Sequence, residues 1–308
     1  MNRFIRLRLL AMLLCLPFLL IFISGCGSSS QKKDEPPVYS PLQVLVPEAT
    51  GKETLGSSPM LLDVSNISQG YFIAQSDSSD LTCSLQIISP SGVLYSYFIA
   101  PGESATVTFT EGSGDYTITG YQQVQGDQYA ALYSETVTVQ LENDFLPFLY
   151  PNQYVNFTPD SKASQLALSM IDEDTVDVNA LQQIYDYVVS NLTYDYEKAD
   201  TVTTGYLPDV DETLKTGTGI CFDYAALTTA MLRSCDIPCK LQIGYAGDIK
   251  HAWIDVYIRS KGWVNQAISF KGDTWTLMDP TFDSNSDDKE AIQDYIGDES
   301  NYTVQFTR

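Results

Sequence analysis

Three residues that suit covalent catalysis follow one another at intervals of about thirty positions: Cys221, His251 and Asp279. The cysteine follows the glycine-containing stretch 217–220, the histidine is the only one in the chain, and the aspartate precedes Pro280. A thiol can attack a carbonyl, an imidazole can take and return its proton, and a carboxylate can orient the imidazole. The sequence therefore predicts a cysteine nucleophile with a His–Asp pair behind it.

The position of Cys221 favours its use as a thiolate. Spacing of apolar residues predicts a helix that begins near Phe222 and ends near Ser234, which places Cys221 at the helix N-terminus. There the helix dipole and free N–H groups favour negative charge and could form part of an oxyanion hole. Gly217 and Gly219 would allow a tight turn and leave room for substrate. Taken alone, the residue would be interpreted as a thiol buried under a helix start.

His251 and Asp279 are candidates for the general base and the orienting carboxylate that a cysteine nucleophile needs. Alternation predicts a strand over 251–258, with His251, Trp253, Asp255 and Tyr257 on one face. Imidazole can act as base and acid near neutral pH. Asp279, at the end of a predicted strand over 274–279, could fix the histidine tautomer.

Three motifs together resemble the transglutaminase-like superfamily. They are Gly219-x-Cys221-x-Asp223-Tyr224-Ala225, His251-Ala252-Trp253 and Asp279-Pro280-Thr281, within a likeness spanning about 145–285. The resemblance implies a papain-related α+β domain in which Cys221 forms a thioester with a glutamine carboxamide or peptide carbonyl. The acyl group would then pass to an amine or to water, giving cross-linking, deamidation or proteolysis. It implies no cofactor and no metal: calcium sites are not recognisable, and no residue matches the family's upstream oxyanion donor.

Residues near these motifs have two interpretations each. Asp223, in the first helical turn, could cap the helix or act in catalysis, and capping is the commoner arrangement. Tyr224 and Trp253 are candidates for substrate binding. Trp253, Trp263 and Trp275 could line a groove or belong to the core.

The N-terminus predicts export and anchoring. Three arginines precede an apolar run over 9–23, and Ser24-Gly25-Cys26 follows. This resembles the lipobox of bacterial lipoproteins, which implies a signal peptide over 1–25, lipidation of Cys26 and a place on the extracytoplasmic face of the cell membrane. The alternative is an uncleaved membrane anchor. Residues 26–55, rich in Ser, Pro, Lys and Glu, predict a flexible tether.

Two domains are expected after the tether. Residues 56–143 show short alternating segments separated by turns, with strands expected at 84–88, 94–99, 105–109, 116–119 and 135–139. They predict an immunoglobulin-like β-sandwich, either a binding module or a spacer. Residues 144–308 predict the α+β catalytic domain, with helices ending at Met170 and over 178–192, then strands over 241–245, 251–258, 263–270 and 274–279.

Charge and cysteine content restrict the partners. The formal net charge is -22, which disfavours nucleic acid. A single histidine and the lack of a Cys/His cluster disfavour zinc. Cys235 and Cys239 could form a disulfide or remain buried thiols. The expected partners are a protein or peptide substrate, such as envelope proteins or peptidoglycan peptides, and the membrane through Cys26. The alternative function is an inactive surface binding or adhesion lipoprotein.

Overall fold

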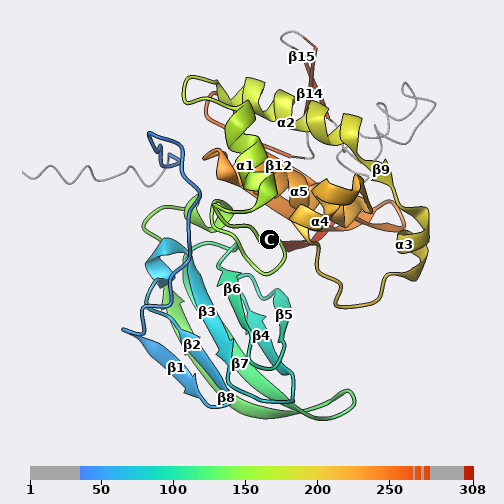
Figure 1. The fold of residues 1–308 in the computed structure, drawn as a ribbon. Helices are drawn as coiled ribbons and strands as arrows, with labels where there is room; N and C mark the ends of the chain where they lie inside the picture. Colours follow the sequence, from blue (N-terminus) through green and yellow to red (C-terminus); the bar gives the residue numbers. More distant parts are fainter. Residues whose placement is uncertain (1–34, 266–267, 272–273, 278–301) are drawn as a thin grey trace, which may run out of the picture. The chain divides into compact units, whose positions relative to one another are not determined.

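A computed structural model describes residues 35–265, 268–271, 274–277 and 302–308, all within one compact unit, residues 31–308 (Figure 1). For 268–271 and 274–277 only the backbone is described. The signal segment, Cys26 and Asp279 lie outside the described residues. Among the helices that are described, none is both long and apolar enough to cross a membrane.

The N-terminal region consists of two antiparallel four-stranded sheets (Figure 1). One has the order β1 (Thr54–Ser57), β2 (Met60–Asp63), β3 (Tyr71–Ser76), β6 (Ser104–Thr108). The other has the order β5 (Leu94–Ile99), β4 (Cys83–Ile88), β7 (Gly114–Gln125), β8 (Gln128–Val139). Side chains from both sheets, such as Phe72 and Ile118, share one core. The mostly β character is confirmed, and the immunoglobulin-like class stays a prediction.

The five strands expected in this region are present, and three more precede them. The sequence does not predict β3, because a strand that is buried on both faces shows no alternation of apolar and polar residues. Phe72 and Ala74 face the core shared by the sheets, whereas Tyr71 and Ile73 pack in a second cluster with Leu146. Residues 67–69 and 146–148 form short 3-10 helices, η1 (Ile67–Gln69) and η2 (Leu146–Phe148).

Part of the expected tether is packed rather than free. Val44 belongs to the core of the α+β domain, and Leu45 packs with Tyr71. The guanidinium of Arg259 donates to the backbone carbonyls of Pro36 and Pro37, at 3.3 Å each. The apolar patch around Val44 and the hydrogen bonds from Arg259 together hold residues 35–46 on the folded body.

The C-terminal region places helices before an antiparallel sheet, as the sequence predicts. The helices are α1 (Lys162–Met170), α2 (Asp177–Asn191), α3 (Tyr196–Thr201), α4 (Val210–Thr216) and α5 (Cys221–Ser234). The sheet has the order β13 (Gly262–Val264), β12 (Ile249–Ile258), β11 (Cys239–Ala246), β16 (Tyr302–Thr307). Two short pairs complete the described elements: β9 (Thr193–Tyr194) with β10 (Thr218–Gly219), and β14 (Ile268–Lys271) with β15 (Thr274–Leu277).

Helix α5 is the centre of this domain. Every residue from Asp223 to Ser234 is buried, so α5 has no solvent face and is surrounded by α1, α2, α4 and the sheet. The strand β12 packs against it with the face that the sequence assigned to the core, Ala252, Ile254, Val256 and Ile258. This packing fixes the two elements that carry Cys221 and His251.

Candidate active site

Cys221 is the first residue of α5, and its thiol is partly exposed. The preceding residue, Ile220, is extended (φ -96°, ψ 175°), so the chain turns into the helix at the cysteine itself. The N–H groups of the first helical turn have no intrahelical acceptor and lie beside the thiol. Cys83, Cys235 and Cys239 are also free thiols, but all three are buried. Among the described residues, Cys221 is therefore the one thiol open to a reagent or substrate.

A buried polar network fixes the start of α5. The carboxylate of Asp223 accepts hydrogen bonds from the backbone N–H of Ile220 (2.8 Å), from Lys198 Nζ (2.7 Å) and from the hydroxyl of Tyr206 (2.5 Å). Lys198 also donates to the Tyr206 hydroxyl at 2.6 Å. Burial, followed by the hydrogen bond to Asp223, raises the pKa of Tyr206 to about 12, so this phenol stays protonated. Asp223 thus caps the helix, and it does not line the cavity described below.

The two glycines before Cys221 serve local packing. Gly217 ends α4 with φ 65°, a left-handed conformation that glycine adopts without strain. At Gly219, an added Cβ would lie 2.6 Å from Cβ of Asp223. The first glycine makes the expected tight turn. The second leaves room for the capping aspartate rather than for substrate.

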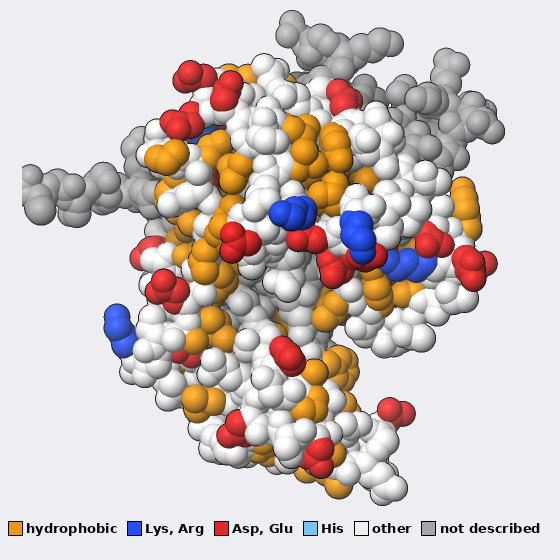
Figure 2. Space-filling model, in the orientation of Figure 1, with side chains coloured by type: hydrophobic (Ala, Val, Ile, Leu, Met, Phe, Trp, Pro, Cys, Tyr) orange, Lys and Arg blue, Asp and Glu red, His pale blue; other side chains and the backbone are white. Residues whose placement is uncertain are grey.

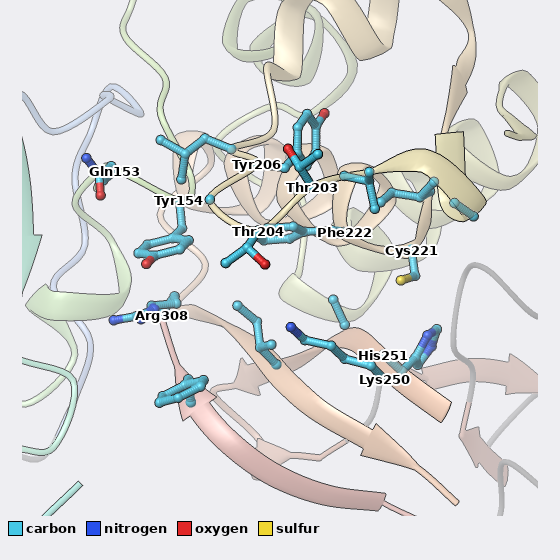
Figure 3. A pocket seen from close by; sticks show the side chains of 18 of the residues that line it. Gln153, Tyr154, Thr203, Thr204, Tyr206, Cys221, Phe222, Lys250, His251 and Arg308 are labelled. Carbon is cyan, nitrogen blue, oxygen red and sulfur yellow. The ribbon is translucent and has the colours of Figure 1, made fainter. Parts of the chain in front are cut away.

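His251 lies on β12, opposite Gly244 of β11, and is 6% exposed. Its ring stacks on Trp253, with 6.3 Å between ring centroids and 16° between planes. Figure 3 shows Cys221 on α5 and His251 on β12 facing one another across a single cavity, which both residues line. A thiol and an imidazole on the wall of one cavity are the pair of groups that nucleophilic catalysis by a cysteine requires.

The cavity has a volume of about 550 Å³, within the usual range of small-molecule and peptide sites. Its walls come from β5, residues 153–154, β9, α3, the segment 202–207, the first turn of α5, β11, β12, β16 and Arg308. The lining residues include Leu94, Phe98, Val202, Leu207, Cys221, Lys250, His251 and Arg308.

The other predicted site residues lie elsewhere. Tyr224 and Trp253 are fully buried, Tyr224 in the core around α5 and Trp253 with Ala246 and Tyr302, and neither lines the cavity. Trp253 shares the strand face of His251, but it lies farther along β12, where Ala246 and Tyr302 cover it. Tyr224 lies one helical turn beyond Cys221, where α5 is fully enclosed. Trp263 stacks against Phe145, and the side chain of Trp275 lies outside the described residues.

Several residues around the cavity had no signal in the sequence. Tyr194 lines it because β9 pairs with β10, which places this tyrosine opposite Gly219. Lys250 and Arg308 line it from β12 and from the end of the chain. These residues meet only through strand pairing between distant segments. No short motif could have predicted them.

Cys235 and Cys239 do not form a disulfide, since both are free. Burial raises the pKa of each thiol to about 12, which makes them poor nucleophiles. Groups of His, Cys, Asp and Glu side chains with the spacing of metal ligands do not occur in the part of the chain that the structure describes.

Comparison with known proteins assigns part of the C-terminal region, its helices and first strands, to a protein family. Residues 164–268 match the family model of the transglutaminase-like superfamily. This range includes Cys221 and His251 and ends before Asp279. The chain therefore contains a transglutaminase-like domain.

Three solved structures are similar at low identity. A proposed cysteine protease from Cytophaga hutchinsonii is 16% identical, with 78% of this chain and 79% of that chain covered and a TM-score of 0.37. The periplasmic domain of TgpA from Pseudomonas aeruginosa, bound to ethylmercury, is 14% identical, with 75% and 98% covered and a TM-score of 0.33. Red sea bream transglutaminase is 14% identical, with 70% and 48% covered and a TM-score of 0.26. Comparison with curated proteins gives no match. Because these TM-scores are low, the assignment rests on the family match.

Proposed function

We propose that the chain is a lipid-anchored, extracytoplasmic cysteine enzyme of the transglutaminase-like type. Cys221 is the nucleophile, His251 is the general base, and Asp279 orients the histidine. The observation that carries the proposal is the partly exposed thiol at the start of α5, facing the only histidine of the chain across a cavity. A buried structural cysteine would need neither the cavity nor the histidine.

The proposed reaction passes through a thioester. His251 takes the proton of the thiol, and the thiolate attacks the carbonyl carbon of a glutamine carboxamide or a peptide bond. The N–H groups at the start of α5 stabilise the resulting oxyanion. The imidazolium then protonates the leaving ammonia or amine, the C–N bond breaks, and the thioester remains. An incoming amine or water, deprotonated by His251, releases the thiol and completes transfer or hydrolysis.

The cellular setting belongs to the same proposal. Lipidation of Cys26 would hold the enzyme at the outer face of the membrane, where envelope proteins and peptidoglycan peptides are the available substrates. The N-terminal β-region, with its expected immunoglobulin-like class, supports the catalytic domain and supplies part of the cavity wall through β5. Replacement of Cys26 by serine should release the protein from the membrane fraction.

Reaction with iodoacetamide near neutral pH tests the nucleophile. Cys221 should be alkylated faster than a thiol in a short peptide, and His251→Gln should slow it roughly tenfold or more, because less thiolate is present. Mass spectrometry locates the label, and the buried Cys83, Cys235 and Cys239 are internal controls. An ordinary rate at Cys221 that is indifferent to His251→Gln would instead support an inactive binding lipoprotein.

The choice between transfer and hydrolysis needs a second experiment. The protein is incubated with glutamine-containing peptides, with and without a primary amine, and the products are analysed by mass spectrometry. A mass increase equal to the amine minus ammonia identifies transfer. A gain of about 1 Da identifies deamidation, and shorter peptides identify proteolysis. A Cys221→Ser variant controls for contaminating activity.

A further inference from the structure

The charge of the cavity differs from the charge of the chain. The sequence contains 39 acidic and 17 basic residues, and acidic side chains are spread over the visible face of the molecule (Figure 2). None of the described residues that line the cavity is acidic, whereas Lys250 and Arg308 are both there. No acidic side chain among these lining residues therefore compensates the two positive charges.

Lys250 is the accessible one of the two cations. It is exposed, it precedes His251 on β12, and Figure 3 shows its side chain extending into the cavity. Within the described part of the chain no carboxylate pairs with its ammonium group. Asp248 and Asp255, on the same hairpin and strand, do not line the cavity, and Asp255 accepts a hydrogen bond from Gln242 at 2.6 Å.

Arg308 supplies a second, buried positive charge. It is 4% exposed, its guanidinium lies 4.1 Å from the ring centroid of Tyr154 and 4.6 Å from that of Tyr95, and one N–H donates to the hydroxyl of Tyr97 at 2.6 Å. Nε has no acceptor, and among the described residues no carboxylate pairs with the group. The ring faces stabilise the buried cation, so Arg308 adds a second positive charge to this wall of the cavity.

Four large apolar side chains at the cavity are unusually exposed. Leu94 and Phe98 come from β5, and Val202 and Leu207 come from the segment that follows α3. They form two apolar walls, one on the N-terminal β-region and one on the transglutaminase-like domain. An occupant that covers them needs an apolar part as well as a charge that suits Lys250.

We infer that the acyl donor attacked by Cys221 is an anionic peptide: Lys250 binds a carboxylate close to the reacting carbonyl, and the apolar walls hold a neighbouring hydrophobic side chain. This inference rests on the proposed function and narrows its substrate class. The acidic surface repels anions at long range, whereas a single carboxylate beside an apolar group gains from the local field inside the cavity. Lys250 is therefore a specificity-determining residue.

Two alkylating reagents of similar size but different charge test the inference without knowledge of the substrate. Iodoacetate is anionic and iodoacetamide is neutral, so the ratio of their rates at Cys221 reports the potential at the thiol. The ratio should exceed that of a cysteine in a neutral peptide and should fall as salt is added. Lys250→Glu should lower it roughly fivefold or more, and Lys250→Met by a smaller factor. Lys52→Glu, the same charge change at an exposed position outside the cavity, should leave it unchanged.

Different results would contradict the inference and the proposed function. One result is fast, His251-dependent alkylation by iodoacetamide, with a rate ratio equal to that of a free peptide thiol and unchanged by Lys250→Glu. In that case the anionic substrate class is wrong and the enzyme proposal stands. If iodoacetamide itself reacts at an ordinary rate, the enzyme proposal fails.

A matched pair of glutamine peptides, one with glutamate and one with glutamine beside the reacting residue, gives a second measurement if Lys250→Glu does not fold. Lys250→Met should raise KM for the acidic peptide by roughly tenfold and leave the neutral peptide unchanged. Equal effects on both peptides would contradict a charge-specific role.

Discussion

Asp223 is the residue on which the geometry around Cys221 depends. It is buried, and three donors from α3, from the segment after α3 and from the backbone before α5 converge on its carboxylate. Loss of its charge would leave Lys198 without its counter-ion, and an amide in its place has one oxygen for three donors. The cap therefore connects the cavity wall at Tyr206 to the helix that carries the nucleophile.

Asp223→Asn should destabilise the fold by about 2 to 3 kcal/mol, because a buried ion pair and a charged cap are lost together while Lys198 keeps partial access to water. Urea unfolding provides the measurement, and alkylation of Cys221 should slow in parallel. Glu212→Gln breaks an ion pair with Lys215 that is open to solvent, and it serves as the matched control with no measurable change. A loss no greater than that of the control would contradict the capping role.

Asp236 provides a test in the pH dependence of stability. Burial raises its pKa from 3.8 to about 7, and Oδ1 has no hydrogen-bond partner. Because the folded state holds this proton more tightly, the favourable contribution is complete below pH 3.8 and is lost as the pH rises to about 7. Asp236→Asn should thus stabilise the protein at pH 8, by roughly 2 kcal/mol, and have little effect near pH 4. Asparagine also suits the backbone φ of 58°.

Asp63 should respond in the opposite direction. Burial opposes ionisation of its carboxyl, but hydrogen bonds from Ser65 and from the N–H of Gly51 lower its pKa below 3.8. Its contribution is present above that pH and is lost as the pH falls. Asp63→Asn should therefore destabilise the protein at pH 7 and matter less in acid. Urea midpoints from about pH 2 to pH 8 for both variants check the signs, because the contribution of Asp63 changes only below pH 3.8. Parallel curves for the two would refute the assignment.

The sequence could predict individual candidate catalytic residues but not the side chains that surround them. Cys221 and His251 were identifiable because glycines, a helix start and a strand start mark their positions locally. Lys250 and Arg308 were not, since their common cavity arises from strand pairing and from β5 of the other region. Tyr224 and Trp253, which lie within the motifs, are candidates for substrate binding by sequence alone, and the structure buries both in cores.

At the scale of elements, prediction succeeded where periodicity is strong. The strand β5 has its predicted bounds, and α2 and α5 begin and end within about one residue of theirs. Short elements such as α3, β9 and β10 have too few residues to show a period, and β16 is separated from its partner β11 by more than fifty residues. Such elements depend on tertiary contacts rather than on local pattern.

The pairing of β16 with β11 depends on one glycine. A Cβ at Gly244 would lie 1.9 Å from the backbone oxygen of Thr303, and a strand backbone cannot give way as a flexible side chain can. Gly244→Ala should therefore separate the strands and destabilise the fold by about 3 kcal/mol. Hydrogen exchange should show lost protection over 302–307. Val304→Ala, at an exposed position of the same strand, should leave that protection intact.

At the scale of the whole molecule, a buried guanidinium joins segments from distant parts of the chain. Arg233 on α5 is fully buried and donates to the backbone carbonyls of Tyr150, Cys239 and Arg308, each at 2.8 Å or 3.0 Å. Burial lowers its pKa to about 10, so it remains charged at neutral pH. Its acceptors lie before α1, at the start of β11 and after β16. Arg308 in turn contacts Tyr97 of β5, so this chain of contacts extends into the N-terminal β-region.

Arg233→Lys should cost about 3 kcal/mol or more, because a single ammonium cannot reach three carbonyls that a planar guanidinium serves at once. The loss should appear in urea unfolding followed by tryptophan fluorescence, together with faster proteolysis between the two regions. Arg259→Lys is the matched control: this arginine also binds carbonyls, of Pro36 and Pro37, but is partly exposed and should cost much less. Equal losses for the two variants would show that Arg233 does not hold the regions together. A larger loss for Arg233→Lys, with normal iodoacetamide labelling of Cys221 in the fraction still folded, would separate this structural role from catalysis.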